Sequence, residues 1–276
     1  MKIIITGFHG QLAGFLVNRL SYKHRIFALS HNEFDISDKN TVSKIITDIS
    51  PDLIINCAAY NDVDKSEYFY EKAFNTNAIG PENLAKYCGK IKLIHFGTDY
   101  VFDGKKRIKY TENDLCSPLN KYGITKYSGE KSVIDSGGMV LRVSWLFGGE
   151  RSFVSTVIKN MKKEKLYISD DQISVPTYSG FVSEITEFFI NNGIFEGLYN
   201  VVPDGEAGRY EYASYILRHF EYKGEVIKVD GNFFEPQAKR PEYSGLDNSK
   251  LKKIYTGKIY DWKYYLGKYL KTVSDN

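Results

Sequence analysis

The chain has 276 residues, of which 42% are hydrophobic and 26% charged. This composition excludes an intrinsically disordered protein, and the length is enough to bury a core in one large domain or two unequal ones. The net charge of +3 is too small to indicate a nucleic-acid or membrane surface. No apolar run reaches the roughly 18 residues of a membrane span, and the N-terminus has no signal-peptide core. We therefore expect a cytoplasmic protein without nucleic-acid or membrane partners.

The cysteines indicate neither disulfides nor a metal site. Cys57, Cys88 and Cys116 are odd in number, far apart in the chain and without the spacing of metal ligands. Three reduced thiols fit the cytoplasmic location, and no metal is expected.

The N-terminal segment has the pattern of a strand, a glycine turn and a helix. The β-branched run 2–6 ends at Gly7, and Gly10 and Ala13 complete a GxxGxx(G/A) motif. In this context the glycines let the backbone approach a pyrophosphate, which rests on the N-terminus of the helix. The chain has 23 glycines, so an ordinary strand-to-helix turn remains the alternative.

The second strand, 25–29, ends at Ser30. A site selective for NAD carries an Asp or Glu there, which binds the 2′-hydroxyl of the ribose. No acidic residue stands at the end of this strand, so we favour NADPH. No arginine attracts a 2′-phosphate either, and NADH stays possible. Asp35 and Ile36 follow in a loop and are expected beside the adenine.

A third apolar strand, 53–57, runs into Ala58, Ala59 and Tyr60. Small residues at the end of a strand permit close approach of a cofactor, although tight helix packing explains them equally well. A helical region, 63–88, leads to a fourth strand, 91–96. The order β-α-β-α-β-α-β predicts a doubly wound α/β fold with a parallel Rossmann sheet.

Chemically useful side chains follow the fourth strand. Thr98 lies where a parallel strand opens into a loop, at the edge where doubly wound folds bind ligands. Tyr122 and Lys126 are four residues apart and share one helix face. Tyr127 begins a second Tyr-x-x-x-Lys pattern roughly 140° around the same helix, so we expect it to be a packing residue. Gly123 leaves room for a cofactor beside Tyr122.

These residue types suggest hydride and proton transfer. A free phenol has a pKa near 10, which is too high for ready proton exchange at neutral pH. We expect the Lys126 ammonium to lower the pKa of Tyr122, so that Tyr122 acts as the proton donor. Lys126 can also donate to ribose hydroxyls, and Thr98 can orient the reacting carbonyl.

Beyond a fifth strand, 139–144, the pattern becomes less regular. We predict a Rossmann domain over 1–147, to which 178–203 returns, and a smaller, interrupted substrate-binding domain over 148–276. The C-terminal stretch is rich in Lys and Tyr, but apolar residues recur at helical spacing, which favours a docked amphipathic helix over a nucleic-acid surface. The other expected elements are helices at 152–163, 181–191 and 210–220, and strands at 198–202 and 225–229.

Several motifs together resemble the extended short-chain dehydrogenase/reductase family, and within it the dTDP-4-dehydrorhamnose reductases. The resemblance spans almost the whole chain, and its most specific parts are Thr98-Asp-Tyr-Val-Phe-Asp-Gly and the Trp after strand five. Further motifs are Thr6-Gly-Phe-His-Gly-Gln-Leu, Phe34-Asp-Ile-Ser-Asp, Pro51-Asp-Leu-Ile-Ile-Asn-Cys-Ala-Ala-Tyr, Val63-Asp-Lys-Ser-Glu, Tyr122-Gly-Ile-Thr-Lys, Leu141-Arg-Val-Ser-Trp, Asp171-Gln-Ile-Ser-Val-Pro-Thr and Arg240-Pro-Glu-Tyr-Ser-Gly-Leu-Asp.

The resemblance implies roles for these residues. The catalytic set would be Thr98, Tyr122 and Lys126. Thr98, Asp99 and Trp145 would hold the sugar ring, and Tyr100 and Arg240, from the same motifs, are further substrate-binding candidates. The cofactor would contact Gly10, Gln11, Leu12, Asp35, Ile36, Ala58, Ala59, Tyr60, Tyr122 and Lys126, to which Gly7 and Ser30 are added by position.

The implied reaction is reduction of the C4 ketone of a nucleotide-linked 6-deoxy-4-ketohexose, dTDP-4-dehydro-L-rhamnose, in nucleotide-sugar and polysaccharide synthesis. Two alternatives remain open. One is a reductase of another NDP-4-keto-6-deoxyhexose, giving a talose- or fucose-type product. The other is a non-catalytic dinucleotide-binding regulatory subunit, against which the intact catalytic set argues. A homodimer is possible.

Three positions depart from the family pattern. Ala13 replaces the third glycine of the phosphate turn, and Gly97 replaces the Ser common before Thr98. Where the family often has Ser-Trp, this chain has Gly208 and Arg209. That change could signal a different nucleotide or sugar, but we expect Arg209 to be a surface residue.

Overall fold

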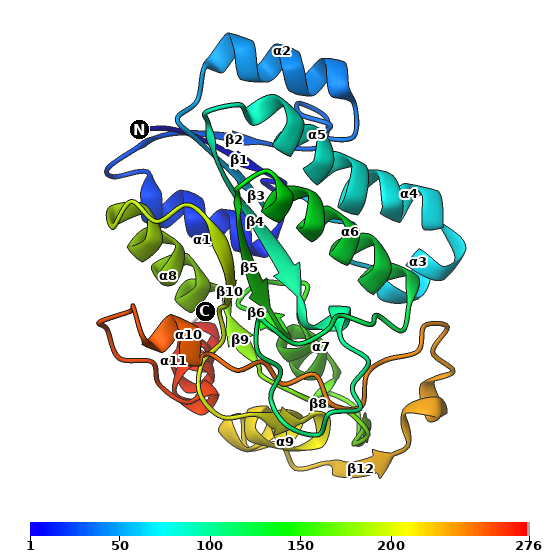
Figure 1. The fold of residues 1–276 in the computed structure, drawn as a ribbon. Helices are drawn as coiled ribbons and strands as arrows, with labels where there is room; N and C mark the ends of the chain where they lie inside the picture. The colour runs from blue at the N-terminus through cyan, green and yellow to red at the C-terminus, as the bar shows by residue number, and fades with distance from the viewer. Residues whose placement is uncertain (275–276) are drawn as a thin grey trace.

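The central sheet has six parallel strands (Figure 1). The structure is a computed structural model that describes residues 1–274; Asp275 and Asn276, the end of the predicted substrate-binding domain, lie outside the described residues. The strand order is β10-β5-β4-β3-β1-β2, which confirms the doubly wound fold. The strands are β1 (Lys2–Thr6), β2 (Arg25–Leu29), β3 (Leu53–Asn56), β4 (Lys92–Thr98), β5 (Met139–Val143) and β10 (Gly197–Asn200).

Helices cover both faces of this sheet (Figure 1). α1 (Gln11–Leu20) and α8 (Ser179–Asn191) pack together on one face, and α2 (Lys39–Ile49), α5 (Gly80–Cys88) and α6 (Lys121–Asp135) lie on the other. Along β1, Ile3 and Ile5 join the core on the α1 side and Ile4 joins the core on the opposite side. This alternation is the period of two of a strand buried on both faces.

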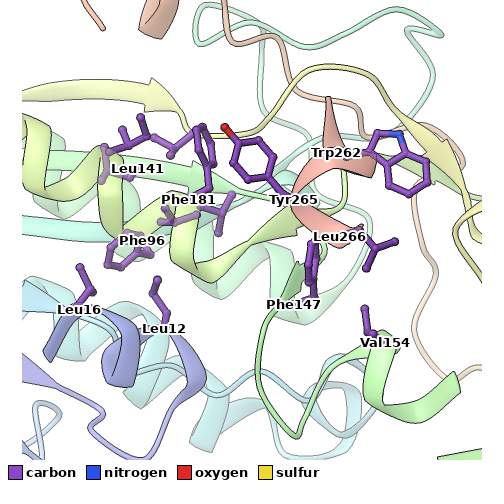
Figure 2. Packing of buried hydrophobic residues seen from close by; sticks show 14 of the residues in the cluster. Leu12, Leu16, Phe96, Leu141, Phe147, Val154, Phe181, Trp262, Tyr265 and Leu266 are labelled. Carbon is purple, nitrogen blue, oxygen red and sulfur yellow. The ribbon is translucent and has the colours of Figure 1, made fainter. Parts of the chain in front are cut away.

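The core on the α1 side extends beyond the sheet (Figure 2). It includes Leu16 of α1 and Phe181 of α8, and it continues through Phe147 to Trp262 and Leu266 of the C-terminal helix α11 (Trp262–Ser274). The predicted docking of an amphipathic C-terminal helix is confirmed. The late part of the chain therefore shares one hydrophobic core with the sheet.

The late elements lie below the carboxyl ends of the strands in Figure 1. β10 pairs with β5, which confirms that this segment returns to the main sheet. One strand, β7, was not predicted: it pairs with β12, and its buried residues alternate with exposed ones. The elements are β6 (Leu146–Phe147), α7 (Phe153–Asn160), β7 (Lys165–Ser169), β8 (Ile173–Ser174), β9 (Thr177–Tyr178), β11 (Ala207–Gly208), α9 (Arg209–His219), β12 (Glu225–Val229) and α10 (Ser249–Lys252).

The predicted helical region 63–88 is not one continuous helix. It divides into α3 (Val63–Tyr68), α4 (Tyr70–Phe74), a π-helical turn (Asn75–Ile79) and α5. Phe69 leaves the helical conformation between the first two pieces. The π turn lets Asn77 reach across to the loop after β3, a contact that sequence periodicity does not reveal.

Among residues 1–274, no helix is long and apolar enough to cross a membrane. In the same part of the chain, no three His, Cys, Asp or Glu side chains gather as metal ligands would. Cys57, Cys88 and Cys116 are free.

Candidate active site

Two polar side chains mark the carboxyl end of β4. Thr98 and Asp99 are buried, with 6% and 2% of their surfaces exposed. The Thr98 hydroxyl accepts from the Tyr100 backbone N–H at 3.2 Å and donates to Asp99 at 3.3 Å. The other carboxylate oxygen of Asp99 accepts from the hydroxyls of Ser174 at 3.0 Å and Ser244 at 2.5 Å. Asp99 therefore ties the sheet to two late segments of the chain and holds the loop that presents Thr98.

Burial raises the pKa of Asp99 to about 6, while the three hydroxyl donors oppose that rise. Its unfolded pKa is about 3.9. The folded protein therefore holds a proton between about pH 4 and 6 that the unfolded chain releases, so the stability from this proton is present at the acid end and is lost as the pH rises through 6. We expect urea unfolding to show the parent losing stability relative to Asp99→Asn across this range. A pH-independent difference would contradict this assignment.

The helix α6 presents Tyr122 and Lys126. Asn120 caps it by accepting from the Gly123 N–H at 2.8 Å. A Cβ at Gly123 would lie 2.3 Å from the Tyr100 carbonyl oxygen, so glycine is required for helix and loop to approach each other. The Tyr122 ring packs edge-on to Tyr100 at 5.8 Å between centroids. The predicted packing role of Tyr127 is confirmed, since it lies against a small apolar cluster with Val101 and Phe102.

The prediction that Lys126 lowers the pKa of the Tyr122 phenol is wrong. The Lys126 ammonium donates to the Phe96 carbonyl at 2.6 Å. Within residues 1–274, the groups that change the pKa of Tyr122 do not include Lys126. Burial raises the pKa of Tyr122, and the Thr98 hydroxyl partly opposes this by hydrogen bonding. Burial lowers the pKa of Lys126 to about 8. Tyr122 is therefore a protonated donor at neutral pH, and its hydroxyl is hydrogen-bonded to Thr98.

A buried polar chain behind Lys126 was missed by the sequence analysis. The ammonium lies 3.4 Å from His95 Nε2, and His95 Nδ1 lies 3.0 Å from the Asn56 amide. Asn56 in turn accepts from the Thr6 hydroxyl at 2.7 Å. Burial and Lys126 lower the pKa of His95 far below its usual value, so the imidazole is neutral, with one ring nitrogen as acceptor and the other as donor. These side chains link α6 to three neighbouring strands, β4, β3 and β1.

The glycine turn fits a dinucleotide pyrophosphate. Gly7 has φ +66°, and a Cβ there would lie 2.9 Å from the Ala58 backbone. At the start of α1, Gly10 provides no side-chain cap and the first turn has no acidic residue, so no side chain of this turn would compete with an anion for the positive end of the helix. Gln11 Oε1 is buried without a hydrogen-bond partner within residues 1–274. Leu12 turns into the core.

The loop after β3 is held from two sides. The Ala58 N–H donates to Thr6 Oγ1 and Asn56 Oδ1, both at 3.1 Å. The Asn77 amide pairs with the Tyr60 backbone in both directions, at 2.8 and 3.0 Å, and donates to Thr125 of α6 at 3.1 Å. Ala59 lies between these anchored residues. Asn77 thus fixes this loop relative to the helix that carries Tyr122.

The prediction that no acidic group stands at the end of β2 is wrong. The Glu33 carboxylate turns back and accepts from the Ser30 N–H at 2.9 Å and the Ser30 hydroxyl at 2.6 Å. These hydrogen bonds lower the pKa of Glu33, so it is charged at neutral pH. Asp35 accepts from Ser37 within its own turn, and Ile36 is buried under α5.

This carboxylate gives a test of cofactor choice. A negative charge at the end of β2 opposes a 2′-phosphate and suits a ribose 2′-hydroxyl. Glu33→Gln is expected to lower the KM for NADPH severalfold, because it removes one exposed negative charge that repels the 2′-phosphate. The KM for NADH should stay nearly unchanged. Initial rates with both cofactors measure this. An equal change for the two cofactors would remove Glu33 from cofactor selection.

A large cavity of about 1430 Å³ lies between the loop after β3 and the late segments of the chain. Trp145 lines it just after β5, in the left-handed backbone conformation at φ +39°, and its indole N–H is buried without a partner within residues 1–274. Such strain in a non-glycine residue is typical of functional sites. Arg240 also lines the cavity and pairs with Asp64 at 2.6 and 3.2 Å. Arg240 also interacts with the buried Tyr100 hydroxyl.

Comparison with known proteins identifies the family. The sequence matches the family described as RmlD substrate binding domain over residues 1–274. The chain belongs to this family. A dTDP-4-dehydrorhamnose reductase from Mycolicibacterium smegmatis is 32% identical over 272 residues, which cover 95% of this chain and 83% of the relative.

Solved structures of dTDP-4-dehydrorhamnose reductases match the fold closely. The dTDP-4-dehydrorhamnose reductase from Clostridium acetobutylicum has 32% identity and a TM-score of 0.96, covering 99% of this chain and 100% of its own. The enzyme from Bacillus anthracis, in complex with NADP, has 31% identity and a TM-score of 0.94, covering 98% and 99%. The resemblance read from the motifs is confirmed at the level of family and fold.

Proposed function

We propose that this protein reduces the C4 ketone of dTDP-4-dehydro-L-rhamnose to give dTDP-L-rhamnose, with NADPH as cofactor and NADH as a possible substitute. One observation carries the proposal: the Thr98 and Tyr122 hydroxyls adjoin at the carboxyl end of β4, in a chain similar to a dTDP-4-dehydrorhamnose reductase over 99% of its length. The product belongs to nucleotide-sugar and cell-surface polysaccharide synthesis.

The residues divide the work by chemistry. When bound, NADPH supplies the hydride that the C4 carbon accepts. Thr98 donates a hydrogen bond that orients the ketone oxygen, and Tyr122 gives that oxygen its proton as the alcohol forms. Lys126, held by Phe96 and His95, presents its ammonium toward the cofactor ribose. The sugar ring is enclosed by four side chains, those of Asp99, Tyr100, Trp145 and Arg240.

The proposed cofactor contacts follow the strand ends. The turn from Gly7 to Leu12 would hold the pyrophosphate, and Ser30 with Asp35 and Ile36 would border the adenosine. Ala58, Ala59 and Tyr60 would pass along the nicotinamide half, beside Lys126. The division into a cofactor-binding part over 1–147 and 178–203 and a substrate-binding part over most of 148–276 is part of the same proposal, and a homodimer remains a prediction for light scattering to test.

The direct test is NADPH oxidation by the purified protein with enzymatically generated dTDP-4-dehydro-L-rhamnose (dTDP-4-keto-L-rhamnose). GDP-4-keto-6-deoxymannose serves as the parallel substrate. Turnover of the dTDP sugar alone, with rhamnose as the product sugar, would support the proposal. Turnover of the GDP sugar at an equal or greater rate would assign the enzyme to a different ketosugar.

A further inference from the structure

Arg209 is not the surface residue that the sequence suggested. Its guanidinium carbon lies 3.6 Å from the centroid of the Trp145 ring and 4.9 Å from that of Phe153. Arg209 also lines the same large cavity as Trp145 and Arg240. Two aromatic faces therefore fix the planar guanidinium in the wall of the substrate side of the site.

This positive charge has no acidic partner. Within residues 1–274, no ion pair or hydrogen bond involves the Arg209 guanidinium, whereas the neighbouring Arg240 is neutralised by Asp64. Asp99 and Tyr100 lie within electrostatic reach of Arg209, but the carboxylate of Asp99 is already bound by Ser174 and Ser244. A partly buried, unpaired cation is costly unless an anion binds beside it.

The position of Arg209 in its helix strengthens this argument. It is the first residue of α9, an eleven-residue helix whose cap, Gly208, provides no side chain. The N-terminus of a helix carries partial positive charge, which disfavours a cation and favours an anion. Glu211, in the same turn, is paired with Lys263 at 2.9 Å and turns its charge elsewhere. Helix and guanidinium therefore present their positive charges together.

We propose that Arg209 binds the diphosphate of the nucleotide-sugar substrate and so sets its orientation in the cavity. The proposal rests on the proposed function for the identity of the anion. A hexopyranose whose C4 lies at Thr98 and Tyr122 carries its diphosphate on C1, across the ring and away from the cofactor. Trp145, which the proposed function places at the sugar ring, lines the same cavity and stacks on Arg209. Arg209 is a substrate-positioning and specificity residue.

Calorimetric titration with dTDP, dTMP and thymidine tests this assignment. Arg209→Gln is expected to raise the Kd for dTDP at least about tenfold, the usual effect of losing a charge-assisted hydrogen bond. The Kd for dTMP should rise less, and the Kd for thymidine should not change. Arg209→Lys keeps the charge but loses the fork and the stacking, so it should recover only part of the affinity. UDP should follow dTDP, because the contact is to the diphosphate.

Two controls keep the result specific. Arg218→Gln, at the exposed other end of α9, should bind dTDP as the parent does. The Kd for NADP⁺, which also carries a pyrophosphate, should not change in Arg209→Gln. Unchanged dTDP binding by Arg209→Gln would overturn the proposal, and so would a loss confined to NADP⁺.

Turnover separates this proposal from the proposed function. If the parent binds dTDP through Arg209 but reduces neither ketosugar, the reaction is wrong and the diphosphate site stands. If the parent reduces dTDP-4-keto-L-rhamnose and Arg209→Gln has the same KM and the same Kd for dTDP, the reaction stands and the diphosphate site is wrong.

Discussion

Tyr122→Phe is expected to lower kcat for ketosugar reduction by about 10²–10⁴-fold, the usual contribution of a positioned general acid. The change removes one oxygen and leaves the ring that packs edge-on to Tyr100. Burial keeps the pKa of Tyr122 above its ordinary value, so the phenol carries its proton throughout the neutral range. The variant has no proton to donate at this position. Steady-state rates with saturating NADPH measure the effect.

The neighbouring Tyr127 provides the matched control for this substitution. It begins the other Tyr-x-x-x-Lys pattern of α6 but packs against the cluster of Val101 and Phe102, on another side of the helix. Tyr127→Phe should keep kcat within about twofold, and both variants should bind NADP⁺ with the affinity of the parent. Equal kcat in Tyr122→Phe and the parent would show that another group donates the proton.

Glu130→Gln is expected to destabilise the protein by about 3–5 kcal/mol, the typical effect of breaking a buried ion pair. Glu130 of α6 and Arg142 of β5 are only 3% and 2% exposed, and the guanidinium donates to the carboxylate at 2.9 and 2.5 Å. Without the carboxylate the buried guanidinium remains charged and unpaired.

Urea unfolding measures this loss, and a second variant tests its cause. Glu130→Gln with Arg142→Met removes both charges, so its free energy of unfolding should exceed that of Glu130→Gln alone. Glu225→Gln breaks the exposed pair with Lys165 and should change stability very little. If the double variant were less stable than the single one, an unpaired charge would not be the cause.

The same ion pair explains one departure from the family pattern. A Cβ at Gly97 would lie 2.9 Å from both Arg142 Cγ and Glu130 Oε2. The Ser that commonly precedes the threonine would therefore displace this pair. Gly97 accommodates the buried ion pair, and the hydroxyl that matters for the site remains that of Thr98.

The sequence was most informative where a segment's own residues determine its structure. Apolar runs placed β1 and β2 at their observed limits, and Thr98 lies at the carboxyl end of β4, the edge of the sheet where the sequence placed it. The choice of Tyr122 over Tyr127 combined helix geometry with the glycine that follows Tyr122. Of the two-stranded β7–β12 pair, the sequence predicted β12 but not β7, although each strand has five residues.

The sequence was least informative where distant residues meet. Arg209 and Trp145 are 209 − 145 = 64 residues apart, and no local pattern predicts that one stacks on the other. The turn of Glu33 back to Ser30 depends on loop conformation rather than on composition. The expected effect of Lys126 on Tyr122 failed because burial, which acts on both groups, is a property of the fold and not of their spacing.

The shared core beneath the sheet limits how this enzyme can move. Trp262 and Leu266 of the last helix belong to the same apolar cluster as Leu16 of the first (Figure 2). A hinge between a cofactor lobe and a substrate lobe would tear that cluster open and expose it to water. The sheet and the late elements are therefore expected to unfold together, as one cooperative unit.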